Sequence, residues 1–118
     1  MKYFTESEFN NFEMMDENLL SMLDDLREAY GHPIKLTSTY RSPDHPIEAK
    51  KSQPGAHASG RAVDVLIKGA DALKCIEIAL QHGITGLGVK QHGDSRFIHL
   101  DNLEATSSKP RPWVWSYE

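Results

Sequence analysis

His57 and Asp64 are the first side chains in this sequence whose types and spacing favour metal chemistry. The imidazole ends a glycine-flanked segment, and the carboxylate follows seven residues later within an apolar run. An aspartate inside an apolar strand is costly unless it is paired or binds a metal, and its neighbours Val63 and Val65 disfavour exposure. Gly60 permits a sharp bend between the two residues. Such a bend brings the imidazole over the strand face from which the carboxylate projects.

The segment 97–101, Phe-Ile-His-Leu-Asp, repeats this mixture of apolar and polar residues. In a strand, Ile98 and Leu100 point to one side, whereas His99 and Asp101 point to the other. Together with the imidazole and carboxylate upstream, His99 completes a set of three ligands that leaves a fourth zinc position for water. Zinc in such a site lowers the pKa of water and polarises a carbonyl group, which is the chemistry of hydrolysis.

Each of these residues alone also has an ordinary structural explanation. His99 can be a hydrogen-bonded core histidine, and Asp64 can pair with Arg41 or Arg61. A metal-free structural domain, in which Asp64 and His99 are paired polar groups of the core, is therefore one alternative. The coincidence of all the candidate ligands favours the metal site.

Helical patterns flank the elements that carry the candidate ligands. Thr5 and Glu8 form a capping-box pattern for a short helix, and Asp16 precedes a longer one that Gly31 ends. A further helix is expected after residue 67, and Cys75 lies in its apolar stripe as a small buried hydrophobe. The apolar positions of that stripe are Ala72, Cys75, Ile76, Ala79 and Leu80.

Alternating or β-rich patterns predict the strands at residues 34–38, 61–67, 87–90 and 96–101. Residues 40–56, with Pro43, Pro46, Pro54 and Gly55, are predicted to form a loop. Residues 113–117 alternate as in a terminal strand or an aromatic flap. The order of elements predicts an α+β fold with a mainly antiparallel sheet and helices packed on one side.

The bulk composition limits the possible classes of protein. A length of 118 residues with 39% hydrophobic content predicts a single domain over residues 1–118. The net charge of -4, with scattered basic residues, makes a nucleic-acid partner unfavourable. Cys75 is the only cysteine, so an internal disulfide and a multi-cysteine zinc cluster are excluded.

No apolar run of the sequence reaches the length of a membrane span, and the first residues lack the apolar stretch of a secretion signal. We expect no membrane partner and a chain that is made in the cytoplasm. If the substrate lies outside the membrane, another factor must release the protein.

Three blocks of the sequence resemble those of a known enzyme family. They are Ser-Thr-Tyr-Arg-Ser-Pro at 38–43, His-x-x-Gly-x-Ala-x-Asp at 57–64 and Phe-Ile-His-Leu-Asp at 97–101. The chain resembles the zinc D-Ala-D-Ala carboxypeptidase family, specifically its small single-domain branch of phage endolysins and murein peptidases, to which Hedgehog domains are similar. The resemblance implies that one zinc ion is held by His57, Asp64 and His99, and that Arg41 binds the substrate carboxylate or stabilises the oxyanion.

Two positions depart from the pattern of the family. Gly55 stands where many members carry serine, and Arg96 stands where many relatives carry the catalytic acid, three residues before the last ligand. An arginine cannot act as a general base. Asp101 is the preferred replacement because the small branch also has Phe-x-His-x-Asp, with Asp94 and His92 as further candidates. The alternatives are that Asp101 only orients a ligand histidine and that His92 is an ordinary turn residue.

The resulting hypothesis is a zinc metallopeptidase that hydrolyses peptidoglycan stem peptides, as a D-Ala-D-Ala carboxypeptidase or as a cross-link endopeptidase of the endolysin type. Its partner is the stem peptide, its cofactor is one zinc ion, and we expect a monomer. After release, such an enzyme acts on the cell wall. The second hypothesis is a zinc-containing module that binds cell wall or protein and has lost catalysis.

Overall fold

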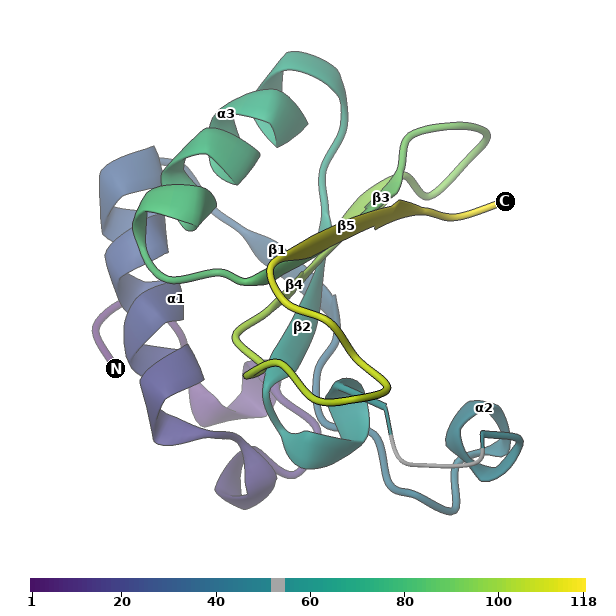
Figure 1. The fold of residues 1–118 in the computed structure, drawn as a ribbon. Helices are drawn as coiled ribbons and strands as arrows, with labels where there is room; N and C mark the ends of the chain where they lie inside the picture. Colours follow the sequence, from purple (N-terminus) through teal and green to yellow (C-terminus); the bar gives the residue numbers. More distant parts are fainter. Residues whose placement is uncertain (52–54) are drawn as a thin grey trace.

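The computed structural model describes residues 1–51 and 55–118. Two longer helices are joined to a five-stranded sheet, and shorter helical turns precede the first long helix and connect the first two strands (Figure 1). The elements in chain order are η1 (Glu6–Glu8), η2 (Phe12–Met14), α1 (Glu17–Tyr30), β1 (Lys35–Ser38), α2 (Pro46–Ala49), η3 (His57–Ser59), β2 (Ala62–Leu66), α3 (Gly69–Gln81), β3 (Gly86–Lys90), β4 (Phe97–Asp101) and β5 (Trp113–Ser116).

The strands lie in the order β1-β2-β4-β3-β5. Neighbouring strands are antiparallel except for β5, which runs parallel to β3 at one edge. This arrangement confirms the predicted α+β class with a mainly antiparallel sheet. The central pair, β2 and β4, contains the candidate ligands, so the polar positions of these strands lie in the middle of the sheet.

Helices α1 and α3 pack against each other and cover one face of the sheet, as predicted (Figure 1). The core between the helices and the sheet is apolar, which follows from the alternation of side chains along the strands. Its fully buried members include Leu19, Leu23 and Leu26 of α1, Cys75 and Ala79 of α3, and Val63, Val65, Ile98 and Leu100 of the central strands. The opposite face of β2 and β4 carries the polar residues Asp64, His99 and Asp101.

The ends of α1 are fixed by the residues that the sequence indicated. The side chain of Asp16 accepts a hydrogen bond from the backbone N–H of Leu19 at 3.0 Å, which satisfies one free donor of the first turn. Gly31 ends the helix with φ +82°, a conformation that glycine adopts without a steric cost. The predicted capping box of Thr5 and Glu8 is present at η1.

The predicted loop at residues 40–56 contains a short helix, α2, which the sequence patterns did not indicate. Pro46 occupies its first turn, where the missing N–H of proline costs nothing, and the His45 side chain accepts from the backbone N–H of Ile47 at 3.2 Å. Pro54, which contributed to the loop prediction, lies outside the described residues.

The stripe predicted for α3 is correct for Ala72, Cys75 and Ala79, but wrong at its end. Ile78 is buried, whereas Leu80 is 56% exposed, because the sheet meets only one side of the last helical turn. Within the described residues, no helix has the length and apolar character required to span a membrane.

Candidate metal centre

His57, Asp64 and His99 meet on the polar face of the sheet. Each offers one ligand atom, and these atoms all lie within 4.8 Å of one another. Oδ1 of Asp64 is 3.2 Å from Nε2 of His57 and 3.3 Å from Nδ1 of His99. Asp64 and His99 are direct partners in the register of β2 and β4, so the pairing of the two strands brings their side chains together.

His57 reaches the group because the chain bends sharply after η3. Gly60 has φ +74°, and a Cβ atom at this position would lie 2.0 Å from the backbone oxygen of Met14. The Gly60 carbonyl also accepts a hydrogen bond from the backbone N–H of Asp16 at 2.9 Å. The bend therefore requires glycine both for its conformation and for this close contact.

Hydrogen bonds orient both imidazole rings. Nδ1 of His57 lies 2.8 Å from the carbonyl oxygen of Thr39, so this nitrogen carries the proton and Nε2 offers its lone pair to the group. Nε2 of His99 likewise donates to Oδ2 of Asp101 at 2.7 Å, which leaves Nδ1 of the same ring facing Asp64.

Nδ1 of His99 is the buried side-chain polar atom, among the described residues, that has no hydrogen-bond partner. Such atoms are rare in proteins and require an explanation. An unprotonated imidazole nitrogen beside a carboxylate and a second imidazole nitrogen is the donor set of a metal site. The buried, unpartnered Nδ1 of His99 therefore indicates that these three residues fit a metal ion.

The electrostatics of the group favour a cation. Burial opposes the ionisation of Asp64, but the adjacent imidazoles of His57 and His99 outweigh it and lower the pKa of this carboxyl to about 2. For His99, burial disfavours the charged ring, yet the carboxylates of Asp101 and Asp64 raise its pKa. Two ionised carboxylates thus concentrate negative charge around the imidazoles.

Asp101 is fully buried and accepts hydrogen bonds at both oxygens. Oδ1 accepts from Nε of Arg111 at 3.0 Å and from the N–H of Leu103 at 3.2 Å, while Oδ2 accepts from His99 and from Nη2 of Arg111 at 2.9 Å. Burial raises the pKa of Asp101, but the hydrogen bonds from His99 and Arg111 outweigh burial and lower the pKa to about 2. This geometry favours the alternative in which Asp101 orients His99; its role as the base stays a prediction.

A cleft of about 660 Å³, called the metal-site cleft below, opens over the three candidate ligands. Basic and aromatic side chains both line it. Its lining residues include Arg41, Lys51, Lys109 and Arg111, the ligands His57, Asp64 and His99, and the aromatic residues Phe97, Trp113, Trp115 and Tyr117.

Arg41 lines the metal-site cleft, in the place that a substrate-binding residue requires. Its Nη1 donates to Oε2 of Glu48 at 3.0 Å and its Nη2 to Oγ of Ser38 at 3.2 Å. Burial disfavours the charge of Glu48, but bonds from Lys51, the N–H of Gly55 and Arg41 lower its pKa to about 2. Glu48 therefore fixes the Arg41 guanidinium at the rim of the cleft.

His92 and Asp94 lie in the turn between β3 and β4, and neither lines the metal-site cleft. Both are exposed, and Nε2 of His92 is 3.2 Å from the carbonyl oxygen of Tyr117. The structure does not bring them to the three candidate ligands. A proton-transfer role for His92 or Asp94 remains a prediction.

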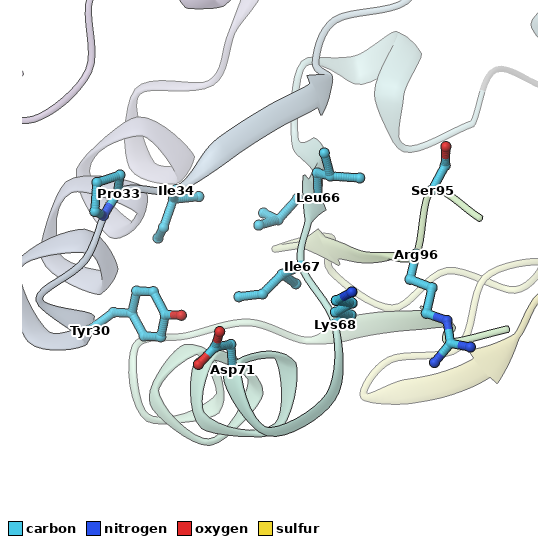
Figure 2. A pocket seen from close by; sticks show the side chains of 10 residues that line it. Tyr30, Pro33, Ile34, Leu66, Ile67, Lys68, Asp71, Ser95 and Arg96 are labelled. Atoms are coloured by element: carbon cyan, nitrogen blue, oxygen red, sulfur yellow. The ribbon is translucent and has the colours of Figure 1, made fainter. Parts of the chain in front are cut away.

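Arg96, which replaces the acid of many relatives, is among the residues that line a different hollow of about 520 Å³ (Figure 2). Lys68 and Asp71 line this hollow together with Tyr30 and Ile34. None of the three candidate ligands borders it. Arg96 therefore does not line the metal-site cleft, and the position of the family's acid supplies no side chain to it.

The sequence patterns assigned no role at the site to three residues that contact the candidate ligands or line the cleft. Arg111 holds Asp101, the Trp115 ring lies 4.9 Å from the His99 ring between centroids, and Tyr117 lines the cleft. The alternation of Trp113, Trp115 and Tyr117 was a usable signal, because it places all three on one face of a strand. Nothing in the sequence near Arg111 indicated its partner.

The fold and the site define a metallopeptidase: an α+β domain that gathers two histidines and an aspartate at the floor of an open cleft. The chain belongs to the peptidase M15 family, since the family model described as Peptidase M15 matches residues 3–101. This match confirms the resemblance to the zinc D-Ala-D-Ala carboxypeptidase family. No curated protein matches the sequence.

Proposed function

We propose that the protein is a zinc peptidase that hydrolyses the stem peptides of peptidoglycan, and that the cell wall is its place of action. The observation that carries the proposal is the convergence of His57, Asp64 and His99, with Nδ1 of His99 buried and without a hydrogen bond. Two histidines, one carboxylate and an open side toward a cleft are typical of catalytic rather than structural zinc. Membership of the peptidase M15 family supports the same reaction class.

In this proposal His57, Asp64 and His99 hold the zinc ion. A bound zinc ion supplies Lewis-acid chemistry, which polarises the scissile carbonyl group and makes water a nucleophile near neutral pH. Arg41 binds a carboxylate of the substrate from the rim of the cleft, because a guanidinium fixed by Glu48 presents its remaining donors in a defined direction.

Tyr117 has a place in the same proposal as a hydrogen-bond donor to the substrate. Burial raises the pKa of its phenol, so the hydroxyl keeps its proton at neutral pH. The aromatic side chains of β5 form a wall beside the ligands. Stem peptides carry several carboxylates, and the basic residues that line the metal-site cleft are complementary to that charge.

Zinc analysis tests the metal site, and product analysis tests the reaction. The purified protein is expected to contain zinc or to take it up; less than about half an equivalent, without uptake of added zinc, would refute the site. Digestion of purified peptidoglycan, followed by mass spectrometry, is expected to release peptides or D-alanine. The product identifies the bond and separates a carboxypeptidase from a cross-link endopeptidase.

His99→Ala is the inactive variant for the digestion, and His32→Ala is its matched control. His32 is exposed and lies outside the metal group, so its removal is expected to leave the products unchanged. Identical products from wild type and His99→Ala would exclude hydrolysis at this site.

A second candidate function is a zinc-containing binding module without catalysis. The observation that favours it concerns the described residues, among which Asp64 is the only carboxylate that lines the metal-site cleft. As a proposed ligand, Asp64 leaves no second acid to accept a proton there. Zinc binding and co-sedimentation with peptidoglycan, without any released product, would establish this function instead.

A further inference from the structure

A buried series of hydrogen bonds connects the C-terminal part of the chain to His99. Arg111 donates from Nε to Oδ1 of Asp101 at 3.0 Å and from Nη2 to Oδ2 at 2.9 Å. Oδ2 accepts from Nε2 of His99 at 2.7 Å. The Asp101 side chain is 0% exposed and that of Arg111 is 8% exposed, so water does not compete for these bonds.

We propose that Arg111 is a positioning residue for the metal site: it clamps Asp101, and through Asp101 it holds the His99 ring with Nδ1 toward His57 and Asp64. The inference deepens the proposed zinc site and rests on it. Arg111 acts through another residue, so its contribution lies in the geometry and affinity of the site.

The chemistry of the contact explains why an arginine serves here. Two parallel bonds from a planar guanidinium fix the rotation of a carboxylate, whereas a lysine ammonium offers a single point of attachment. Gly86 provides the necessary room, because a Cβ at this position would lie 2.3 Å from both oxygens of Asp101. The carboxylate is therefore confined by β3 on one side and by Arg111 on another.

The same segment also packs against the His99 ring. The Trp115 ring lies 4.9 Å from the His99 ring, and the Arg111 guanidinium lies 5.4 Å from the centre of the Trp115 ring. Arg111 and Trp115 both follow residue 101, where the match to the peptidase M15 family ends. Two of the residues that support His99, Arg111 and Trp115, thus lie beyond the matched range.

The test compares Arg111→Met and Arg111→Lys with Arg61→Met in the full chain. Arg61 is a matched control because it is a partly buried arginine that donates to Asn102, from Nε to the side chain at 3.1 Å and from Nη2 to the carbonyl at 2.6 Å. Among the described residues, its side chain bonds to Asn102 and makes no hydrogen bond or ion pair with Asp101 or His99. Thermal unfolding of each metal-free variant reports whether the fold is retained.

Zinc affinity, measured by competition with a chromophoric chelator, is the first measurement. Partners that orient a metal ligand change affinity by about 10- to 100-fold, so Arg111→Met is expected to bind zinc at least about tenfold more weakly than wild type. Arg111→Lys is expected to lie between the two, since it keeps the charge but not both bonds. Arg61→Met is expected to match wild type.

The visible absorption spectrum of the cobalt-loaded protein is the second measurement. A His99 ring that has lost its support changes the ligand geometry, so the bands of Arg111→Met and Arg111→Lys are expected to shift while those of Arg61→Met do not. If Arg111→Met does not fold, Arg111→Lys decides by the same criteria. Affinity and bands of the folded Arg111 variants equal to those of Arg61→Met would overturn the inference, even if KM for peptide had changed.

Metal uptake by the wild-type protein distinguishes a failure of the positioning role from a failure of the proposed function. If wild type takes up neither zinc nor cobalt, the metal site itself is refuted, and the positioning role falls with it. If wild type binds zinc and the folded Arg111 variants bind it equally well, the metal site stands and only the positioning role is refuted.

Discussion

Gly86→Ala provides a quantitative test of how tightly Asp101 is held. The added methyl group would lie 2.3 Å from both Asp101 oxygens, so the carboxylate has to move by about 1 Å to reach an ordinary contact. The bonds from Arg111 at 3.0 and 2.9 Å do not survive such a shift, because hydrogen bonds weaken steeply beyond about 3.2 Å. Breaking a buried ion pair costs about 3–5 kcal/mol.

We therefore expect Gly86→Ala to lower the free energy of unfolding of the metal-free protein by about 3 kcal/mol. Urea denaturation followed by circular dichroism measures this change. In the Asp101→Ala background the obstacle is gone, and alanine in a strand is as good as glycine or better by about 0.5–1 kcal/mol. The cycle of single and double variants should thus give a coupling energy of about 3–4 kcal/mol.

Gly83→Ala is the control for this cycle. Gly83 has φ +98°, and a Cβ atom at this position would meet nothing within 4 Å, so its replacement costs only the backbone strain of about 1–2 kcal/mol, in either background. An equal loss of stability from Gly86→Ala with and without Asp101 would refute the reasoning, as would a loss no larger than that of Gly83→Ala.

Three further predictions concern single residues. Asp101→Asn is expected to weaken zinc binding by about tenfold if the carboxylate orients His99, whereas a base role predicts unchanged affinity and a lower kcat; zinc titration and kinetics decide. Glu48→Gln should destabilise the protein at pH 7, and less so as the pH falls from 4.5 toward 2: the folded pKa of about 2 is below the ordinary value of 4.5, so the contribution of Glu48 is present above 4.5 and disappears toward 2. Denaturant midpoints across this pH range measure the difference. The Cys75 thiol, whose pKa burial raises to about 11, should stay unmodified by a thiol reagent at pH 8 until denaturant unfolds the chain; rapid labelling of the native protein would contradict its burial.

The central sheet and the convergence of the candidate ligands Asp64 and His99 were predictable because strand parity determines which side chains share a face. Asp64 and His99 occupy polar positions in otherwise apolar strands, and an ion or a partner is then required by the cost of burying them. The bend at Gly60 was predictable for a similar reason. These inferences depend on neighbours in sequence or on one strand pairing.

The features of the fold and site that the sequence did not predict depend on contacts between residues that no local pattern encodes. Arg111 reaches Asp101 from an irregular segment ten residues away, and periodicity says nothing about such a path. The exposed Leu80 follows from where the sheet ends beneath α3, which is a tertiary property. Pro46 reads as a loop residue in the sequence, although the same proline also begins α2.

The strand order has a consequence for the local stability of the site. Strands β2 and β4, which carry Asp64 and His99, each have a neighbour on both sides, whereas β5 pairs only with β3. In hydrogen–deuterium exchange, the amides of the inner strands should exchange only in large openings, and those of β5 in small ones. Because Trp115 lies on β5 and Arg111 just precedes it, fraying of this edge would release the His99 ring while the sheet beneath remains intact. In the proposed zinc site, the rate of metal exchange would then be set by the edge strand.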